Sequence, residues 1–300
     1  MSDTSRINLD GAVVVITGGG RGIGAATAEA FTARGAHVWI GDIDTDVAAA
    51  TAARLPHCSS GTLDVTSVDS WREFLTRVIE AEGRIDILVN NAGVMPLGSF
   101  VDESEATTDL ILDVNVRGVV NGMRAVLPGM VEAGRGHIVN VASMAGMIPL
   151  AGMVTYNGSK FAALGLSLAA RREYSGTGVT VTAVLPSAVR TELASGAPLG
   201  KGMPTVDPED VAAAVVDSVR HRRERVSVPG WLAPGWTAVQ TLVPRFIENA
   251  VRRLVDDRRA LTGIDAAVRR AYLDRIERHA ADHTAASTAA PNRTREQGPR

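Results

Sequence analysis

The chain has 300 residues, 45% hydrophobic and 21% charged, so it can bury a sizeable core, and disordered or fibrous architectures are excluded. Its 31 basic and 33 acidic side chains give a net charge of −2, which provides no basic field for nucleic acid. Cys58 is the only cysteine and the six histidines show no ligand spacing, so neither an intrachain disulfide nor a metal site is expected. The first residues lack the basic and apolar regions of a signal peptide, which predicts a cytoplasmic protein.

Short apolar runs rich in β-branched residues alternate with longer amphipathic stretches from residue 12 to about residue 228. This alternation is typical of repeated strand–helix units around a parallel sheet. In chain order, strands are predicted at 12–17, 37–41, 61–64, 86–90, 136–142, 179–185 and 225–229, and helices at 22–34, 46–54, 68–82, 104–131, 155–174 and 208–221. The sequence therefore predicts an α/β fold with one doubly wound, seven-stranded parallel sheet, in a single domain over residues 1–230.

The pattern changes after Pro229, where Pro and Gly interrupt the apolar residues too often for a membrane span. Two helices are predicted at 237–255 and 263–283, the second with Ile264, Val268, Tyr272 and Ile276 along one face. We expect residues 231–283 to pack on the domain as a helical extension and residues 284–300 to be disordered. This end is mildly basic, so a membrane surface or a partner subunit is an alternative contact, but we favour a solvated face around a packing helix.

A glycine-rich turn joins the first predicted strand to the first predicted helix. It contains Gly18, Gly20, Arg21, Gly22, Ile23 and Gly24. Glycines at such a turn let the backbone approach a diphosphate, which then meets the free N–H groups at the start of the helix. The second strand leads into Asp42 and Ile43, and an acid there can accept hydrogen bonds from both ribose hydroxyls while repelling a 2′-phosphate. The pattern predicts NAD as the cofactor, with NADP as the alternative because the Arg21 guanidinium could pair with a 2′-phosphate.

Tyr156 and Lys160 lie four residues apart on a predicted helix, and therefore on one face of it. An ammonium close to a phenol lowers the phenol's pKa, which would make Tyr156 a general base for an alcohol and a general acid for a ketone. Lysine is rare in this chain, since 29 of the 31 basic residues are arginines, so its presence here indicates that an ammonium is required. Ser143 follows a predicted strand and could donate a hydrogen bond to a developing alkoxide.

These motifs together resemble the short-chain dehydrogenase/reductase family over residues 10 to about 230. The resemblance is carried by TGGGRGIG (17–24), LDVT (63–66), NNAG (90–93), VNVRG (114–118), Ser143, the Tyr156–Lys160 motif and residues 186–191. It implies a Rossmann fold, an NAD(P)-dependent oxidoreductase activity on CH–OH groups, and pairing of subunits into homodimers or homotetramers through the helices at 104–131 and 155–174.

The resemblance also implies roles for individual residues. Lys160 would bind the nicotinamide ribose and tune Tyr156, Ser143 would orient the substrate oxygen, and Asn115 would hold a water chain that leads from Lys160 to solvent. The remaining positions would contact the cofactor: Asp64 and Val65 at the adenine, Asn91, Ala92 and Gly93 in a turn that cradles it, and Pro186, Val189 and Thr191 near the carboxamide. Two positions depart from the family pattern, Ser187 in place of the usual Gly and Gly158 in place of the usual Ala.

The expected substrate is an apolar secondary alcohol or ketone, lipid-like or steroid-like. This expectation rests on methionines and other apolar residues near the catalytic positions (Met95, Met144, Met147, Ile148, Met153 and Val154) and on a Gly- and Pro-rich segment, 192–207, interpreted as a mobile lid. The apolar residues from Trp231 to Val255 are expected to close the pocket of their own subunit or to reach a neighbouring one.

We expect an NAD-dependent oxidoreductase that interconverts an alcohol and a carbonyl. Two alternatives stay open: an NADP-linked carbonyl reductase, and a catalytically silent NAD-binding protein that senses redox state or scaffolds a complex. The second is opposed by the presence of Ser143, Tyr156, Lys160 and Asn115, since a sensor needs only the nucleotide-binding half of the site.

Overall fold

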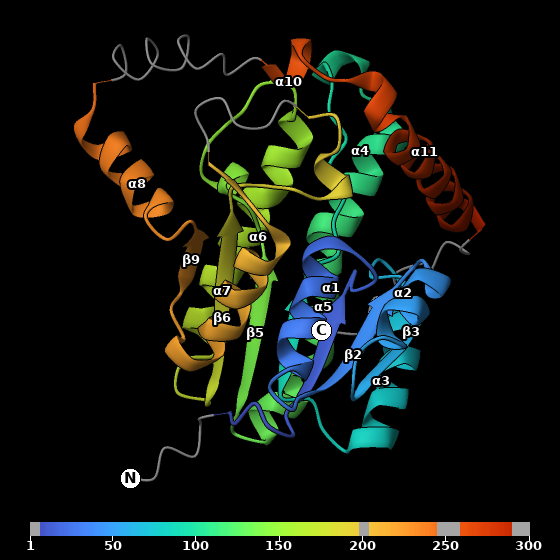
Figure 1. The fold of residues 1–300 in the computed structure, drawn as a ribbon, viewed down its shortest axis with the longest axis vertical. Coiled ribbons are helices and arrows are strands. Elements are labelled where there is room, and N and C mark those ends of the chain that lie inside the picture. The colour runs from blue at the N-terminus through green and yellow to red at the C-terminus, as the bar shows by residue number, and fades with distance from the viewer. Residues whose placement is uncertain (1–6, 198–203, 245–258, 290–300) are drawn as a thin grey trace, which may run out of the picture.

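The computed structural model describes residues 7–197, 204–244 and 259–289 (Figure 1). Seven parallel strands form one sheet in the order β3-β2-β1-β4-β5-β6-β9. They are β1 (Val13–Thr17), β2 (His37–Asp42), β3 (Cys58–Thr62), β4 (Ile87–Asn90), β5 (Gly136–Val141), β6 (Val179–Pro186) and β9 (Arg225–Val228). The predicted doubly wound sheet is confirmed. Its strand order reverses between β1 and β4, which opens a crevice at the carboxyl ends of these strands.

The third strand lies slightly earlier than predicted. It covers residues 58–62, whereas the prediction was 61–64. The chain leaves the sheet before Asp64 because the Oδ1 atom of this residue accepts hydrogen bonds from the backbone N–H and the hydroxyl of Thr66, at 2.9 Å and 2.7 Å. Such a local side-chain bond favours a turn over a strand. Asp64 and Val65 therefore lie in the crevice rather than in the sheet.

Helices cover both faces of the sheet. On one face lie α1 (Gly22–Thr32), α2 (Thr45–Ala52) and α7 (Pro208–His221), and on the other α3 (Val68–Glu82), α5 (Gly118–Glu132) and α6 (Val154–Glu173). Successive residues of β1 serve the two faces: Val14 and Ile16 pack in the first layer, whereas Val13 and Val15 pack in the second. These layers hold the carboxyl ends of the strands in fixed positions.

The predicted helix at 104–131 is interrupted. It begins as α4 (Glu105–Leu112), widens into a π-helical turn, η2 (Asp113–Arg117), and continues as α5. The turn brings Asn115 into contact with Val94, which follows β4. Turns of this kind occur frequently at functional sites, where they aim a side chain that a regular helix would turn away.

The C-terminal residues form α8 (Leu232–Leu242), α10 (Arg259–Thr262) and α11 (Ala266–Ala289). The helix predicted at 237–255 begins earlier, at Leu232, and its residues after 244 lie outside the described part of the chain. α11 continues to residue 289, so residues 284–289 are helical, while 290–300 are outside the described residues. α8 and α11 stand on opposite sides of the molecule (Figure 1).

The packed face of α11 differs from the predicted one. Tyr272 and Ile276 are buried against α4, as expected, but Val268 is 59% exposed. The buried face is instead Arg269, Tyr272, Ile276 and Ala280. The prediction was wrong because a search for apolar periodicity passes over a buried arginine. No helix among the described residues is both long and apolar enough to span a membrane.

Candidate active site

The glycine-rich turn is shaped by close backbone contacts. A Cβ atom on Gly18, whose φ is +61°, would lie 2.8 Å from the Cα atom of Ala92. A Cβ atom on Gly24 would lie 2.2 Å from the carbonyl oxygen of Gly18. A larger residue at position 18 would therefore push the turn away from Ala92, and one at position 24 would push it away from the start of α1. The turn leaves the N–H groups at this end of α1 facing the crevice, where they and the helix dipole favour an anion.

Asp42 closes the turn from the neighbouring strand. Its Oδ2 atom accepts a hydrogen bond from the N–H of Gly20 at 2.9 Å, and its Oδ1 atom accepts one from the N–H of Asp44 at 3.0 Å. Each carboxylate oxygen keeps a further lone pair that can accept a hydroxyl hydrogen. Asp42 also lines the cavity described below, together with Ile43.

The turn after β4 is tied to the glycine-rich turn. The hydroxyl of Thr17 accepts hydrogen bonds from the N–H groups of Asn91 and Ala92, both at 3.0 Å. The Asn91 amide in return donates to the carbonyl groups of Thr17 and Gly18, at 3.0 Å and 2.9 Å. These hydrogen bonds join the end of β1 to the turn after β4, at the point where the strand order reverses.

Ser143, Tyr156 and Lys160 meet at the far end of the crevice. Ser143 follows β5 and caps the short 3₁₀ helix η3 (Met144–Gly146), while Tyr156 and Lys160 lie one turn apart on α6. The Nζ atom of Lys160 is 5.7 Å from the centre of the Tyr156 ring and donates a hydrogen bond to the carbonyl of Val141 at 3.1 Å. The predicted catalytic side chains are therefore close together.

Burial dominates the proton affinities of this pair. It raises the pKa of Tyr156 to about 12, an effect that the hydrogen bond from Ser143 opposes and the nearby Tyr272 reinforces. It lowers the pKa of Lys160 to about 8. The expected lowering of the Tyr156 pKa by Lys160 is not found, because both groups are removed from water and burial disfavours both charged forms.

Asn115 lies behind the cavity and joins three elements. Its Oδ1 atom accepts a hydrogen bond from the N–H of Val94, and its amide donates to the Val94 carbonyl and to the Ser159 hydroxyl, at 2.9, 2.9 and 3.0 Å. A Cβ atom on Gly93 would lie 3.2 Å from the Asn115 oxygen and 3.6 Å from the Lys160 Nζ atom. Both polar atoms therefore face the same glycine. The predicted water chain stays a prediction.

Asn157 has a positioning role that sequence reasoning missed. Its amide donates hydrogen bonds to the carbonyl groups of Ala145 and Ile148, at 2.7 Å and 3.1 Å, and its oxygen accepts one from the N–H of Leu150 at 3.1 Å. One buried side chain thus holds the segment after Ser143 against α6. Ser187 acts similarly, since its hydroxyl donates to the Pro204 carbonyl at 2.6 Å and ties down the end of the predicted lid.

A cavity of about 940 Å³ connects the glycine-rich turn with Ser143 and Tyr156. Its size matches the upper range of small-molecule sites. Most predicted site residues line it: Gly18, Arg21, Gly22, Ile23, Asp42, Ile43, Asp64, Val65, Asn91, Ala92, Gly93, Ser143, Tyr156, Lys160, Pro186, Val189 and Thr191. Gly20, Gly24 and Asn115 are not in the lining and act through the contacts given above.

The apolar wall differs in part from the expected one. Met95, Met144 and Met153 line the cavity, but Met147 and Ile148 pack into a separate core cluster with Leu232 of α8, and Val154 is exposed. Leu193, Ala194 and Ala197 of the predicted lid also line it, whereas residues 198–203 lie outside the described chain.

α11 supplies a wall that sequence reasoning missed. Its side chains in the lining are Tyr272, Arg275, Ile276, His279 and His283, at helical spacing. The predicted cover, residues 231–255, is absent from the lining among its described residues. The spacing of these residues was visible in the sequence, but a helical period does not say which surface the helix covers.

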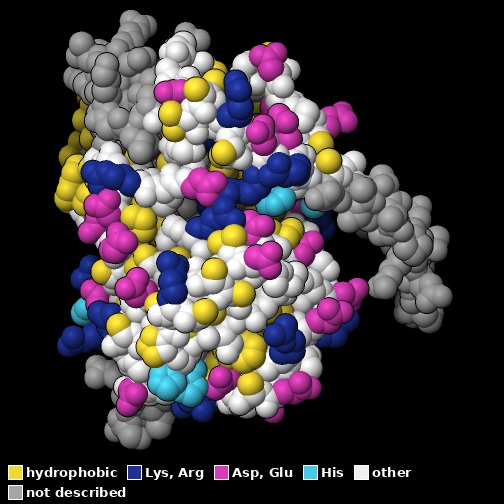
Figure 2. Space-filling view, turned by 45° about the vertical axis from the view of Figure 1, so that its right-hand side comes forward, with side chains coloured by type: hydrophobic (Ala, Val, Ile, Leu, Met, Phe, Trp, Pro, Cys, Tyr) yellow, Lys and Arg dark blue, Asp and Glu magenta, His cyan; other side chains and the backbone are white. Residues whose placement is uncertain are grey.

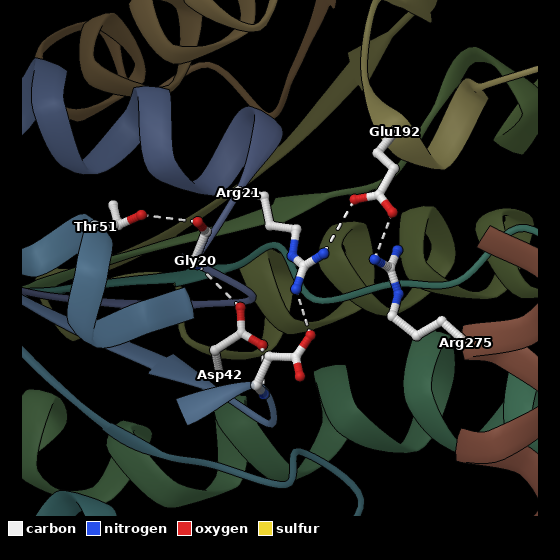
Figure 3. A network of polar contacts seen from close by, with 7 residues as sticks. Gly20, Arg21, Asp42, Thr51, Glu192 and Arg275 are labelled. Atoms are coloured by element: carbon white, nitrogen blue, oxygen red, sulfur yellow. Dashed lines mark hydrogen bonds and ion pairs between the residues drawn. The ribbon is translucent and has the colours of Figure 1, made fainter. Parts of the chain in front are cut away.

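Charged side chains in the cavity lining form a series of ion pairs. Arg21 donates to the Asp44 carboxylate at 2.5 Å and to Glu192 at 3.1 Å, and Arg275 of α11 donates to Glu192 at 2.6 Å (Figure 3). The view that brings the side of α11 forward shows basic, acidic and histidine side chains close together in the middle of that face (Figure 2). The Arg21 guanidinium is therefore already paired with two carboxylates.

Several known proteins are similar to this chain in sequence or in fold. The profile of a family described as short chain dehydrogenase matches residues 12–200. An oxidoreductase, UcpA, of Salmonella typhimurium is 37% identical over 219 residues, which cover 72% of this chain and 82% of the relative. A 3-alpha-(or 20-beta)-hydroxysteroid dehydrogenase of Mycobacterium tuberculosis is 37% identical over 63% of this chain and 74% of its own.

A solved structure shows the same fold with a cofactor bound. It is a short chain dehydrogenase/reductase from Burkholderia phymatum in complex with NAD, with a TM-score of 0.72 and 26% identity over 78% of this chain and 95% of that one. The family profile itself spans more than half of the present chain. The chain accordingly belongs to the short-chain dehydrogenase/reductase family of oxidoreductases.

Proposed function

We propose that the protein is an NAD-dependent oxidoreductase that interconverts a secondary alcohol and a ketone on an apolar substrate. The observation that carries this proposal is one continuous cavity lined at one end by the glycine-rich turn and Asp42, and at the other by Ser143, Tyr156 and Lys160. A dinucleotide and a substrate can then share a single enclosed space.

Each catalytic group has a separate task. A bound nicotinamide dinucleotide supplies the hydride donor or acceptor. Tyr156, with a pKa near 12 in the cofactor-free protein, is protonated at neutral pH and can donate its proton to a carbonyl oxygen. The Ser143 hydroxyl can hydrogen-bond the same oxygen, and Lys160 holds a positive charge beside the Tyr156 ring.

Two observations favour NAD over NADP. Asp42 is the last residue of β2 and lines the cavity. The negative charge of its carboxylate would repel a 2′-phosphate. Arg21, the residue that could counter this charge, is paired with Asp44 and Glu192. An acid in this position together with an engaged arginine supports a ribose with two free hydroxyls.

The substrate end of the cavity supports an apolar alcohol or ketone. Its lining near Tyr156 is mostly aliphatic or aromatic, with Met95, Leu97, Met153, Ala194, Tyr272 and Ile276. Relatives include a hydroxysteroid dehydrogenase and a 2,5-dichloro-2,5-cyclohexadiene-1,4-diol dehydrogenase, whose named substrates carry hydroxyl groups on apolar rings. If charged hydroxy acids were turned over faster than apolar alcohols of similar size, the substrate proposal would fail.

Binding of the two dinucleotides tests the cofactor proposal. Titration of tryptophan or NADH fluorescence should give a Kd for NADH at least tenfold below that for NADPH, a difference of about 1.4 kcal/mol. Asp42→Ala should lose most of this preference because the repulsive carboxylate is gone. Tighter binding of NADPH by the wild type would favour the carbonyl-reductase alternative.

A variant at Tyr156 tests whether the protein is a catalyst. Tyr156→Phe removes the transferable proton but keeps the ring, so turnover of any alcohol or ketone found in a substrate screen should fall by about 10²–10⁴-fold. The Kd for NADH should change little. Unchanged turnover would remove Tyr156 from the mechanism, and binding of NADH without turnover of any substrate would favour the silent sensor.

A further inference from the structure

Arg275 belongs to a helix outside the residues that the family profile matches, yet it lines the same cavity as Gly22 and Thr191. Its side chain is only 18% exposed. The guanidinium lies 5.4 Å from the centre of the Tyr272 ring and donates a 2.6 Å hydrogen bond to the Oε1 atom of Glu192. A largely buried cation that lines a proposed nucleotide site is a candidate ligand for an anion.

The position of Arg275 is set by its neighbours on α11. Arg269 donates hydrogen bonds to the carbonyl groups of Leu193 and Ser195, at 3.2 Å and 2.7 Å, and to that of Met95. The hydroxyl of Tyr272 accepts a hydrogen bond from the N–H of Met95 at 2.7 Å. α11 is thus bound to the segments after β4 and after β7 (Ala188–Val189), and it carries Arg275 as a fixed part of the cavity wall.

Arg269 and Arg275, which both belong to α11, use their donors differently. Among the described residues, Arg269 donates hydrogen bonds to three backbone carbonyls. The hydrogen bond of Arg275 engages Nη1, and its guanidinium otherwise lies beside the Tyr272 ring. A guanidinium has five N–H donors, so most of those on Arg275 remain available for a second acceptor.

Glu192 marks a place where an anion is stabilised. One of its carboxylate oxygens contacts Arg275 and the other contacts Arg21 (Figure 3). Burial works to raise the pKa of Glu192, but Arg21 and Arg275 more than offset it and hold this pKa below its usual range. Glu192 follows Thr191, whose methyl carbon would lie 3.2 Å from a Cβ atom on Gly22, so the bridge lies next to the start of α1.

We propose that Arg275 binds the diphosphate of the dinucleotide from the α11 side of the cavity, while the glycine-rich turn binds it from the α1 side. The inference rests on the proposed function, because it requires a dinucleotide in this cavity. A planar guanidinium can donate two parallel hydrogen bonds to phosphate oxygens. The C-terminal helix is then a part of the cofactor site.

Three probes separate contact with the diphosphate from general damage to the pocket: NADH, ADP and adenosine. In Arg275→Met, which keeps an unbranched apolar stem against Tyr272, the Kd for NADH and for ADP should rise about tenfold or more. The Kd for adenosine, which has no phosphate, should stay at its wild-type value. Arg270→Met is the matched control, because Arg270 is exposed on the same helix, and it should bind all three probes as the wild type does.

Arg275→Lys provides a second variant in case Arg275→Met does not fold. It keeps the charge but loses the planar fork, so the Kd for ADP should be intermediate and that for adenosine unchanged. Wild-type ADP binding in the folded variants, or an equal loss of ADP and adenosine binding, would overturn the role of Arg275. A wild type that bound neither NADH nor NADPH would instead contradict the proposed function itself.

Discussion

His137 is a fully buried histidine near the start of β5. Its Nδ1 atom contacts the Thr180 hydroxyl at 2.8 Å, and its Nε2 atom contacts the Ser218 hydroxyl of α7 at 3.0 Å. Burial first, and then the positive charges of Arg222 and Arg171, lower the pKa of His137 to about 3. The ring therefore remains neutral in the folded protein at any pH near neutrality, and it serves as a polar link between the sheet and α7.

This shift predicts a pH-dependent loss of stability. Between the unfolded pKa of about 6.5 and the folded pKa of about 3, His137 is protonated in the unfolded chain but neutral in the folded protein. The stabilisation is complete above pH 6.5 and declines as the pH falls. From pH 7 to pH 5 the free energy of unfolding should decrease by up to about 2 kcal/mol from this group alone.

Denaturant titrations at pH 5, 6 and 7 check the expectation. His137→Gln should show a flatter pH dependence than the wild type over this range, although its stability at pH 7 is lower. His221→Gln, at an exposed position, is the control and should keep the wild-type slope. Equal slopes in the wild type and His137→Gln would show that His137 does not govern acid sensitivity.

At the level of single residues, the sequence was informative where chemistry demands a particular side chain. Tyr156, Lys160 and Asp42 were identified from spacing and from the rarity of lysine, and they line one cavity. The proton affinities of Tyr156 and Lys160 could not be predicted, because they depend on how completely neighbouring segments exclude water. Asn157 escaped notice because nothing in a sequence marks a residue that bonds only to backbone.

The helix α6 carries a glycine that no contact among the described residues of this chain requires. A Cβ atom on Gly158 would meet nothing within 4 Å, and the position is exposed. Gly146 in η3 is the opposite case, since a Cβ atom there would lie 2.6 Å from the carbonyl oxygen of Lys160. Substitution of Gly158 therefore tests the backbone entropy of α6, whereas substitution of Gly146 tests the steric fit of η3 against α6.

Substituting alanine at each position should have opposite effects. Gly158→Ala should raise the free energy of unfolding by about 0.5–1 kcal/mol, because glycine loses more backbone freedom in a helix than alanine does. Gly146→Ala should lower it by about 1–3 kcal/mol, since the segment after Ser143 must move away from α6. Chemical denaturation with an unchanged m value measures both, and a destabilised Gly158→Ala would reveal a contact on the outer face of α6.

At the level of elements, hydrophobic periodicity predicted every strand of the large sheet and the helices that flank it. It failed where side chains interrupt a regular pattern. The turn at Asp64 ended β3 early, and the π turn around Asn115 divided one predicted helix into two parts. The Asp64 side chain bonds to Thr66, two residues away, whereas Asn115 bonds to Val94 and Ser159, which are distant in the sequence. A periodic pattern of apolar residues detects neither kind of bond.

For the whole molecule, the placement of α11 was the largest gap. Its helical pattern was visible, but the docking surface depends on Arg269, a charged residue that is almost completely buried and bonds to carbonyls about 74 to 174 positions earlier in the chain. Contacts over such separations cannot be inferred from local periodicity. The role of the extension in the site therefore emerges only from the tertiary structure.

The outer surfaces of α4 and α6 carry the last prediction, which concerns assembly. Leu112 of α4 is 42% exposed, and Val154 and Phe161 of α6 are 49% and 44% exposed. The same two helices belong to the ranges for which the sequence predicted subunit pairing, so we propose that these side chains are buried between two copies of the chain. Each large apolar side chain that becomes buried contributes about 1.5–3 kcal/mol, which makes Phe161 a sensitive position.

Light scattering after gel filtration gives the mass in solution. The wild type should be a dimer or tetramer, and Phe161→Glu should shift it towards the monomer, because a carboxylate would lose its hydration at the centre of the interface. Val68→Glu is a suitable control, since Val68 is also exposed and apolar but begins α3, away from α4 and α6. A monomeric wild type would show that no such interface forms, and a Phe161→Glu variant that keeps the wild-type mass would place the interface elsewhere. Either result would leave the exposed faces of α4 and α6 as ordinary surface.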